Sequence, residues 1–395
     1  MNQYVLINRI QVQNANAVSG FTWGFPAVTH FLGFVHNLTR KLMNSDFSKM
    51  KLSGCAVIAH EHHVHTYGKY GDNFTQSRNP PYLPSHDKAS APPVIEEGKM
   101  NMTVSLLIGC EGNVGYQAND FIGWLEKHCL MQRLAGGTIL DIDAVSIVST
   151  ETNADRHAIK RKLLPGFSLM DRSSSLENHF EKLKEKNSEA EMLDAWLDFS
   201  ALKQQSRPRF DLIQKYLDGL SCVSDSEGED LLTAWQSHLA VVPYDAKSIP
   251  NSLRQHFSNL QSSKSNAKLI VQWQEYIQPT ENSDADWERL PKPESKGFFV
   301  PLMIGYKAIT SVFENEKIAN TRDSETPVCF VEAVHSVGEW RGVNRLRSAE
   351  DFAESLWHYS YEEHWYLCQQ RSSTDKSEDN NEATLVATLD EIFGE

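Results

Sequence analysis

Alternation of polar and apolar residues predicts that the chain begins with a β-strand at residues 4–12. Successive side chains of a strand point to opposite faces, so residues two apart share a face. The expected faces are apolar, with Leu6, Ile10 and Val12, and polar, with Arg9, Gln11 and Gln13. The pattern therefore indicates a strand with one buried side and one polar side.

A turn and an amphipathic helix are expected next. Small and amide-bearing residues from Asn14 to Gly20 favour a turn, and Pro26 suits the first turn of a helix. Apolar residues then recur at helical spacing, at Val28, Phe31, Leu32, Val35, Leu38 and Leu42. Arg40 and Lys41 would lie in the last turn of this helix, where positive charge suits the helix dipole.

Three further strands and a second helix would complete a core with the order βαββαβ. The strands are expected at 55–67, 99–109 and 138–149, and the helix at about 118–134. Gly136–Gly137 resembles a helix stop signal. This order is that of the split-βαβ or ferredoxin-like arrangement. We therefore interpret residues 1–172 as a ferredoxin-like, RRM-like core of an α+β protein.

The rest of the chain divides into segments that differ in composition and in the spacing of apolar residues. The core would carry a long hairpin loop at 68–93, rich in Gly, Pro, Asn and Ser. The later segments would be a helical insertion and linker at 173–296, a C-terminal α/β part at 297–369 that completes the core, and an acidic tail at 370–395. Within the C-terminal part we expect strands at 297–309 and 327–334 and a helix at about 348–360.

The charge of the chain limits how it could bind a polyanion. The 395 residues carry a net charge of -14, so the whole surface cannot be a nucleic-acid footprint, although a local basic groove remains compatible. Six cysteines occur without a CxxC pair, which excludes a zinc knuckle and a CxxC redox site. With neither a signal peptide nor a long apolar run, we expect a cytoplasmic protein without a membrane span.

A run of histidines, HEHHVH, raises the question of a metal site. His60 and His62 would share one strand face, and His63 and His65 the other. A metal-dependent hydrolase could use His60 and His62 as ligands. Val64 stands where such motifs carry an acidic residue, so the sequence favours a polar strand that enters an exposed hairpin. We predict neither a metal nor a cofactor.

Single-stranded RNA could be bound at the end of the first strand. Arg9, Gln13, Asn14 and Asn16 offer a guanidinium group and amides for bases and phosphates, and Trp23 could stack on a base. The alternative is an Asn-rich turn that caps itself, together with a core tryptophan. Spacing alone does not decide between them.

Two other stretches could contact phosphates. Lys160, Arg161 and Lys162 form a dense cationic cluster, with Arg156 and Arg172 nearby. The commoner fate of such a run is a solvated helix face. Because apolar residues follow the cluster in KRKLLPGF, the sequence favours a polyanion contact.

Gly136–Gly137 could present backbone amides to a phosphate or simply cap a helix, and both could hold. Motifs for nucleophilic or paired-carboxylate catalysis are not found.

Seven segments, in order along most of the chain, match one known family. They read IQVQNANAVSGFTWGFPAVTHFLGFVHNLTRKL (10–42), SRNPPY (77–82), IEEGKMNMTVSLLIG (95–109), MQRLAGGTIL (131–140), KRKLLPGFSLMDR (160–172), GFFVPLMIGYKAIT (297–310) and NTRDSETPVCFVEAVHSVGEWRG (320–342). The chain thus resembles the second Csy subunits of type I-F CRISPR–Cas surveillance complexes, which belong to the RAMP superfamily. The resemblance does not extend to about 173–290 or beyond 370.

The resemblance implies a noncatalytic RNA-binding subunit. Such a subunit holds the 5′ handle of the CRISPR RNA and pairs with the large Csy subunit. Together they cap the filament of the backbone Csy subunit, and target double-stranded DNA is met through the whole complex. By motif match, RNA contacts are expected at Arg78, Arg133, Arg322, Gly136–Gly137 and 160–162. The alternative is a RAMP-type endoribonuclease that processes precursor RNA with a histidine as general acid–base.

Overall fold

The computed structural model describes residues 3–69, 73–78, 82–91, 94–113, 115–223, 226–261, 263–314, 317–319, 321 and 326–371. The chain forms two compact units. The first unit comprises the described residues of Met1–Phe199 and Ser295–Glu395, and the second is Ser200–Glu294. The tail at 372–395 lies outside the described residues.

A ten-stranded sheet, antiparallel throughout, organises the first unit. Its spatial order is β11 (Arg133–Leu134), β12 (Gly137–Ser149), β1 (Gln3–Asn16), β10 (Lys99–Glu111), β4 (Lys51–Val64), β13 (Phe167–Asp171), β17 (Val331–Gly342), β16 (Phe298–Ala308), β19 (Trp365–Gln370) and β18 (Trp357–Glu362). Strand β4 also pairs with β18, through Cys55 and Trp357. If the short strands between them are left out, β1, α1, β4, β10, α2 and β12 follow the expected βαββαβ order.

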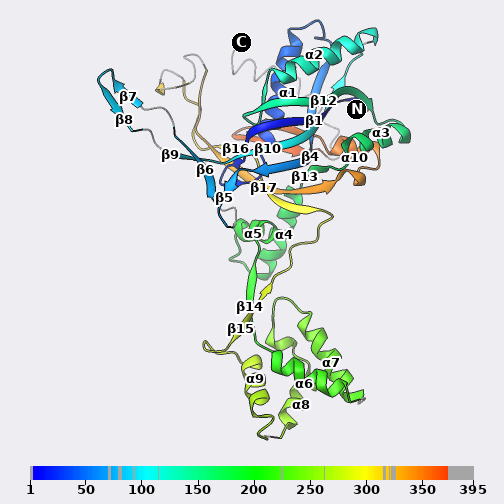
Figure 1. Cartoon of the computed structure of the whole chain (residues 1–395), viewed down its shortest axis with the longest axis vertical. Coiled ribbons are helices and arrows are strands. Elements are labelled where there is room, and N and C mark those ends of the chain that lie inside the picture. Colours follow the sequence, from blue (N-terminus) through cyan, green and yellow to red (C-terminus); the bar gives the residue numbers. More distant parts are fainter. Residues whose placement is uncertain are drawn as a thin grey trace. The chain divides into compact units, whose positions relative to one another are not determined.

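Helices cover both faces of the sheet (Figure 1). Helices α1 (Val28–Met43) and α2 (Ala118–Leu130) place Phe31, Leu38 and Phe121, all fully buried, against one face. Helices α3 (Asn153–Leu163) and α10 (Ala349–Glu354) pack against part of the other face. Each large apolar side chain buried in this way contributes roughly 1.5–3 kcal/mol, so α1 is anchored mainly by packing.

Strand β1 is buried on both faces at its start. This corrects the prediction that one face is buried and the other polar. Ile10 and Val12 belong to the core beneath α1, whereas Leu6 belongs to the core on the opposite face. Arg9 and Asn14 have positive φ angles, and the register shifts around both of them. Because each bulge adds one residue to the strand, the alternation changes face at these points.

The turn expected between Asn14 and Gly20 is shorter than predicted. Strand β1 continues to Asn16, and a small hairpin follows, made of β2 (Val18–Ser19) and β3 (Thr22–Trp23). Its turn contains Gly20 at a φ of +62°, a conformation that favours glycine.

Helix α2 ends at Leu130, several residues before the predicted end. Gly136–Gly137 is therefore not a helix cap. Ala135 and Gly136 both have positive φ angles in the tight turn that joins β11 to β12. Two successive positive φ angles are typical of hairpin turns, for which glycine is also suited.

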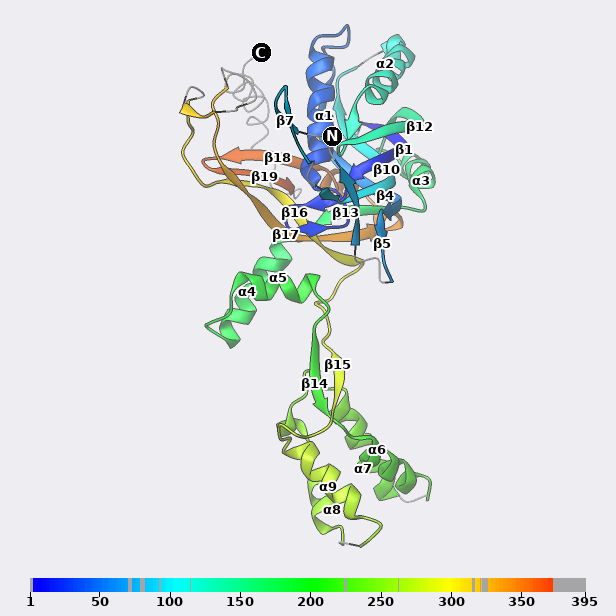
Figure 2. The ribbon, with the colours of Figure 1, turned by 60° about the vertical axis from the view of Figure 1, so that its left-hand side comes forward.

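Two other segments contain strands where we expected a loop or a helix. The described residues of 66–97 belong to an arm that leaves the sheet (Figure 1). Its strands are β5 (Thr66–Tyr67), β6 (Asn73–Arg78), β7 (Tyr82–Ser85), β8 (Lys88–Ser90) and β9 (Val94–Glu97). The helix predicted at 348–360 stops at Glu354, and the hairpin β18–β19 follows beside β16 (Figure 2).

The helices of residues 173–296 are divided between the two units. Helices α4 (Ser173–Lys186) and α5 (Met192–Ser200) lie almost wholly in the first unit. The second unit is built from the paired strands β14 (Gln204–Pro208) and β15 (Ala285–Arg289), and from helices α6 (Asp211–Ser221), α7 (Ser226–Leu239), α8 (Asn251–Asn259) and α9 (Ala267–Ile277). These helices enclose an aromatic core that includes Trp235, Trp273 and Tyr276. Strand β15 lies near the end of 173–296, in the part interpreted as a linker.

Candidate nucleic-acid interface

The residues predicted to bind RNA fall into two groups in the first unit. One group lies where β1 ends beside the β11–β12 turn, and the other where α3 ends. The first group contains Gln13, Asn14, Asn16, Arg133, Gly136 and Gly137, and the second contains Arg9, Lys160, Arg161 and Lys162. Trp23 lies on β3. Arg322 and the side chain of Arg78 lie outside the described residues.

Backbone contacts bring the end of β1 against the β11–β12 turn. The Asn16 N–H donates to the Ala135 carbonyl oxygen at 2.8 Å. At Gly137 an added Cβ would lie 2.7 Å from the Gln13 carbonyl oxygen, so only glycine fits this approach. At Gly136 an added Cβ would meet nothing within 4 Å. Gly137 therefore serves the fold, while Gly136 borders open space.

Asn14 and Asn16, at the end of β1, differ in the hydrogen bonds that they form within the chain. The Asn16 amide donates to the Val18 carbonyl at 2.7 Å and accepts from the Val18 N–H at 3.1 Å. It therefore forms the self-capping turn that was the alternative to RNA contact. The Asn14 backbone N–H donates to the Asn101 side-chain oxygen at 3.1 Å, and the Asn14 side chain is exposed.

An open pocket of about 460 Å³ lies between α1 and the segment that leads into the β11–β12 turn. Its lining residues are His30, Gly33, Phe34, Asn37, Lys41, Met131, Gln132, Arg133, Ala135 and Gly136. Burial lowers the pKa of His30, whose Nδ1 lies 3.3 Å from the Ala27 carbonyl oxygen. His30 is therefore neutral at pH 7, and the cations of this pocket are Lys41 and Arg133.

The residues predicted from the sequence did not include the α1 side of this pocket. His30, Gly33, Asn37 and Lys41 follow helical spacing on the side of α1 away from the apolar stripe. That spacing was visible in the sequence. What it lacked was the opposing wall, which comes from residues a hundred positions later.

Arg9 and His60 belong to a polar network on the other face of the sheet. The Arg9 backbone N–H donates to Ser105 Oγ at 2.9 Å, and its guanidinium donates to the Leu164 carbonyl at 3.2 Å. His60 Nδ1 lies 2.7 Å from the Pro165 carbonyl oxygen, and Nε2 lies 2.7 Å from Ser105 Oγ. Because a carbonyl only accepts, Nδ1 carries the proton in the neutral ring.

This network leaves His60 poorly placed as a catalytic or metal-binding group. Burial, backed by the nearby charge of Arg9, lowers the His60 pKa against the opposing effect of the Pro165 contact. Both ring nitrogens already contact groups of the same chain. Within the described ranges, no group of three or more His, Cys, Asp or Glu side chains could hold a metal ion.

The three neighbouring cations of α3 lie in its last turn, where they also suit the helix dipole. The Lys162 ammonium lies 3.3 Å from Ser146 Oγ, and Arg161 and Lys162 are exposed. Arg156, expected to join this cluster, instead donates to the backbone carbonyl of Glu151 at 2.9 Å. It is committed to the fold rather than to phosphates.

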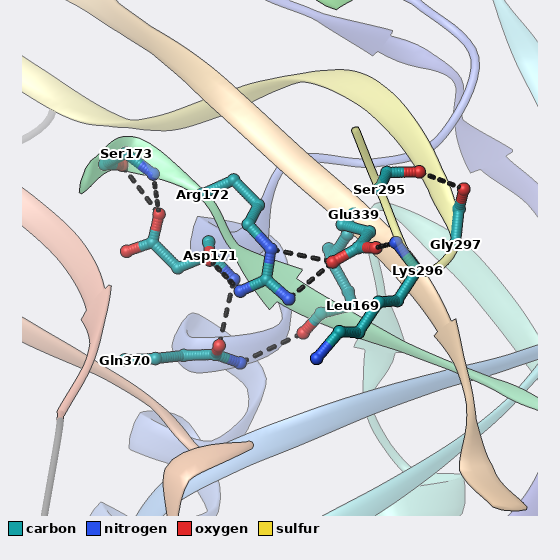
Figure 3. A network of polar contacts seen from close by, with 9 residues as sticks. All are labelled: Leu169, Asp171, Arg172, Ser173, Ser295, Lys296, Gly297, Glu339 and Gln370. Carbon is teal, nitrogen blue, oxygen red and sulfur yellow. Dashed lines mark hydrogen bonds and ion pairs between the residues drawn. The ribbon is translucent and has the colours of Figure 1, made fainter. Parts of the chain in front are cut away.

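Arg172, the other expected member, is committed to a buried ion pair (Figure 3). Its Nε donates to Glu339 Oε2 at 2.7 Å, and Glu339 is only 1% exposed. The second Glu339 oxygen accepts from the Lys296 N–H at 2.8 Å. One carboxylate thus holds Arg172 and Lys296, which border the excursion of the chain through residues 173–295 on its two sides.

Trp23 is half exposed, at 52%, which corrects the alternative of a core tryptophan. Its ring meets Phe74 of β6 edge-on, with the ring centroids 5.1 Å apart. An edge contact of this kind orients an indole without covering both of its faces. Trp23 therefore remains suited to stacking on a base.

Comparisons with known proteins identify the family to which the chain is similar. The family described as CRISPR-associated protein (Cas_Csy2) matches residues 5–215 and 244–368, so within about 173–290 only residues 216–243 are unmatched. A relative, "CRISPR-associated protein Csy2" of Pseudomonas aeruginosa (strain UCBPP-PA14), is 27% identical over 376 residues, covering 91% of each chain. Among the described residues, no helix is long and apolar enough to cross a membrane. The chain therefore belongs to the Csy2 family of CRISPR-associated proteins, subunits of the type I-F Csy complex.

Proposed function

We propose that this chain is a noncatalytic, cytoplasmic subunit that holds the 5′ handle of a CRISPR RNA. In this proposal it pairs with the large Csy subunit, adjoins the backbone Csy subunit, and meets target double-stranded DNA through the assembled complex. The observation that carries the proposal is the gathering of Asn37, Lys41, Arg133 and Gly136 around one open pocket. Amides, cations and exposed backbone are the groups that recognise single-stranded RNA.

The arrangement of the sheet supports a ferredoxin-like, RAMP-type core. The neighbouring strands β12, β1, β10 and β4 are antiparallel, and α1 and α2 contribute to the same hydrophobic core. In this reading β13, β16 and β17 extend the core, and the helices of 173–296 are an insertion into it. The occupied nitrogens of His60 argue against this one histidine as the general acid–base of the endoribonuclease alternative.

Coexpression with the large Csy subunit and a CRISPR RNA tests the proposal. We expect the purified pair to retain the RNA and to protect its 5′ handle from nuclease digestion. A control RNA with a scrambled handle should be retained more weakly. A stable pair that holds no RNA, and that does not bind RNA added later, would contradict the proposed function.

A further inference from the structure

Helix α1 contains a glycine that the fold of this chain does not require. Gly33 lies inside α1, between the buried residues Leu32 and Phe34, and is itself exposed. An added Cβ at Gly33 would meet nothing within 4 Å. Glycine in a helix interior is destabilising relative to alanine, because it loses more conformational freedom on folding. Among the described residues, no close packing at this position requires the glycine.

The open space at Gly33 belongs to the pocket between α1 and the β11–β12 turn. The pocket has a second glycine, Gly136, where an added Cβ would also meet only open space. Both walls therefore lack side chains at the points where another molecule could approach the backbone closely. A volume of about 460 Å³ is within the range of pockets that hold one small ligand.

The polar groups of this pocket are arranged for a nucleotide. Asn37 Nδ2 donates to Gln132 Oε1 at 2.7 Å, and Gln132 Nε2 donates to the His128 carbonyl at 3.1 Å. These two bonds fix the Asn37 amide and leave its Oδ1 and second amide hydrogen for the edge of a base. The exposed side chain of Met131 supplies apolar surface for a base.

The charges of the pocket are suited to a phosphate. Lys41 and Arg133 both line it, and within the described ranges neither forms an ion pair with a carboxylate. Cations that no carboxylate neutralises attract the phosphates of a nucleic acid.

We propose that this pocket binds one nucleotide of single-stranded RNA, with Asn37 at its base and Lys41 and Arg133 at its phosphate. The inference rests on the proposed function and deepens it, because it assigns one nucleotide to a defined place. It also gives Gly33 its physical reason, since a side chain there would occupy the space of the nucleotide.

The test compares two glycines in matched settings. Gly33→Leu would fill the pocket, whereas Gly123→Leu would place the same side chain on an exposed face of α2, where an added Cβ also meets nothing within 4 Å. Binding of a fluorescent oligoribonucleotide with the sequence of the 5′ handle, by the chain paired with the large Csy subunit, would be followed by anisotropy. We expect Gly33→Leu to weaken binding about ten-fold and Gly123→Leu to leave it unchanged. Leucine is a better helix former than glycine, so neither variant should lower the urea midpoint.

Lys41→Ala provides a second, independent readout. One fewer phosphate contact should flatten the plot of log affinity against log salt by about 0.7, and Lys41→Arg should restore the slope. Unchanged binding in Gly33→Leu, together with an unchanged slope in Lys41→Ala, would overturn the pocket while leaving RNA binding elsewhere on the chain intact. No binding by the unaltered pair would overturn the proposed function as well.

Discussion

Removing the charge of Glu339 should destabilise the first unit strongly. Glu339 is 1% exposed and accepts hydrogen bonds from the Arg172 guanidinium and the Lys296 N–H. In Glu339→Gln, one oxygen becomes an amide donor that faces donors, and Arg172 loses its counter-charge. Breaking a buried ion pair costs about 3–5 kcal/mol. Because the Arg172 side chain is 23% exposed and can be partly rehydrated, we expect a loss of about 3 kcal/mol.

Urea unfolding combined with hydrogen exchange would measure this effect. Peptides that cover β17 and residues 295–300 should lose protection in Glu339→Gln, since both segments contact this carboxylate. The control is Glu314→Gln, which removes an exposed partner of Lys317 with 3.5 Å between the charged atoms. Such an exposed pair contributes at most about 1 kcal/mol. Equal urea midpoints for the two variants would show that the buried pair does not stabilise the unit as reasoned here.

Three further outcomes are expected. Changing residues 160–162 together to Ala should weaken RNA retention and lessen its salt dependence. The control, Lys186→Ala at the end of α4, should do neither. An unchanged dependence of affinity on salt would show that the cluster is only a solvated helix face. Trp23→Ala should weaken single-stranded RNA binding about ten-fold, and Trp23→Phe should retain most of it; equal binding by both variants would refute stacking. The folded-state pKa of His60 is lowered, so its contribution to stability is present above the unfolded pKa of about 6.5 and is lost as the pH falls below it. The urea midpoint should therefore decline less between pH 7.5 and pH 5.5 in His60→Gln than in the unaltered chain, and equal declines would contradict this.

The elements that sequence patterns predicted well are those that keep one periodicity of apolar residues over their whole length. Helix α1 keeps a single apolar stripe from Val28 to Leu42, and β10 alternates from Met100 to Ile108, so both were predicted closely. Strand β1 was misread because the bulge at Arg9 adds a residue that alternation cannot reveal.

The same contrast holds for the candidate interface. The family motifs suggested Arg133, the local sequence suggested Gly136, and both line the pocket beside α1. Arg156 and Arg172 were assigned to a phosphate site because a cluster of cations has the same sequence pattern whether or not its side chains are bound by other groups of the chain. Their partners are a nearby backbone carbonyl and Glu339, which follows Arg172 by 167 positions. Only the folded chain brings that partner into contact.

The pairing of β4 with three other strands has a consequence for synthesis on the ribosome. One edge of β4 pairs with β10, and its other edge meets β13 and β18. Strand β10 emerges soon after β4, whereas β18 emerges about three hundred residues later. Until then part of that second edge has unpaired backbone groups, which in a nascent chain can pair with another chain. The long excursion through residues 173–295 prolongs the interval in which this edge of β4 is open to such pairing.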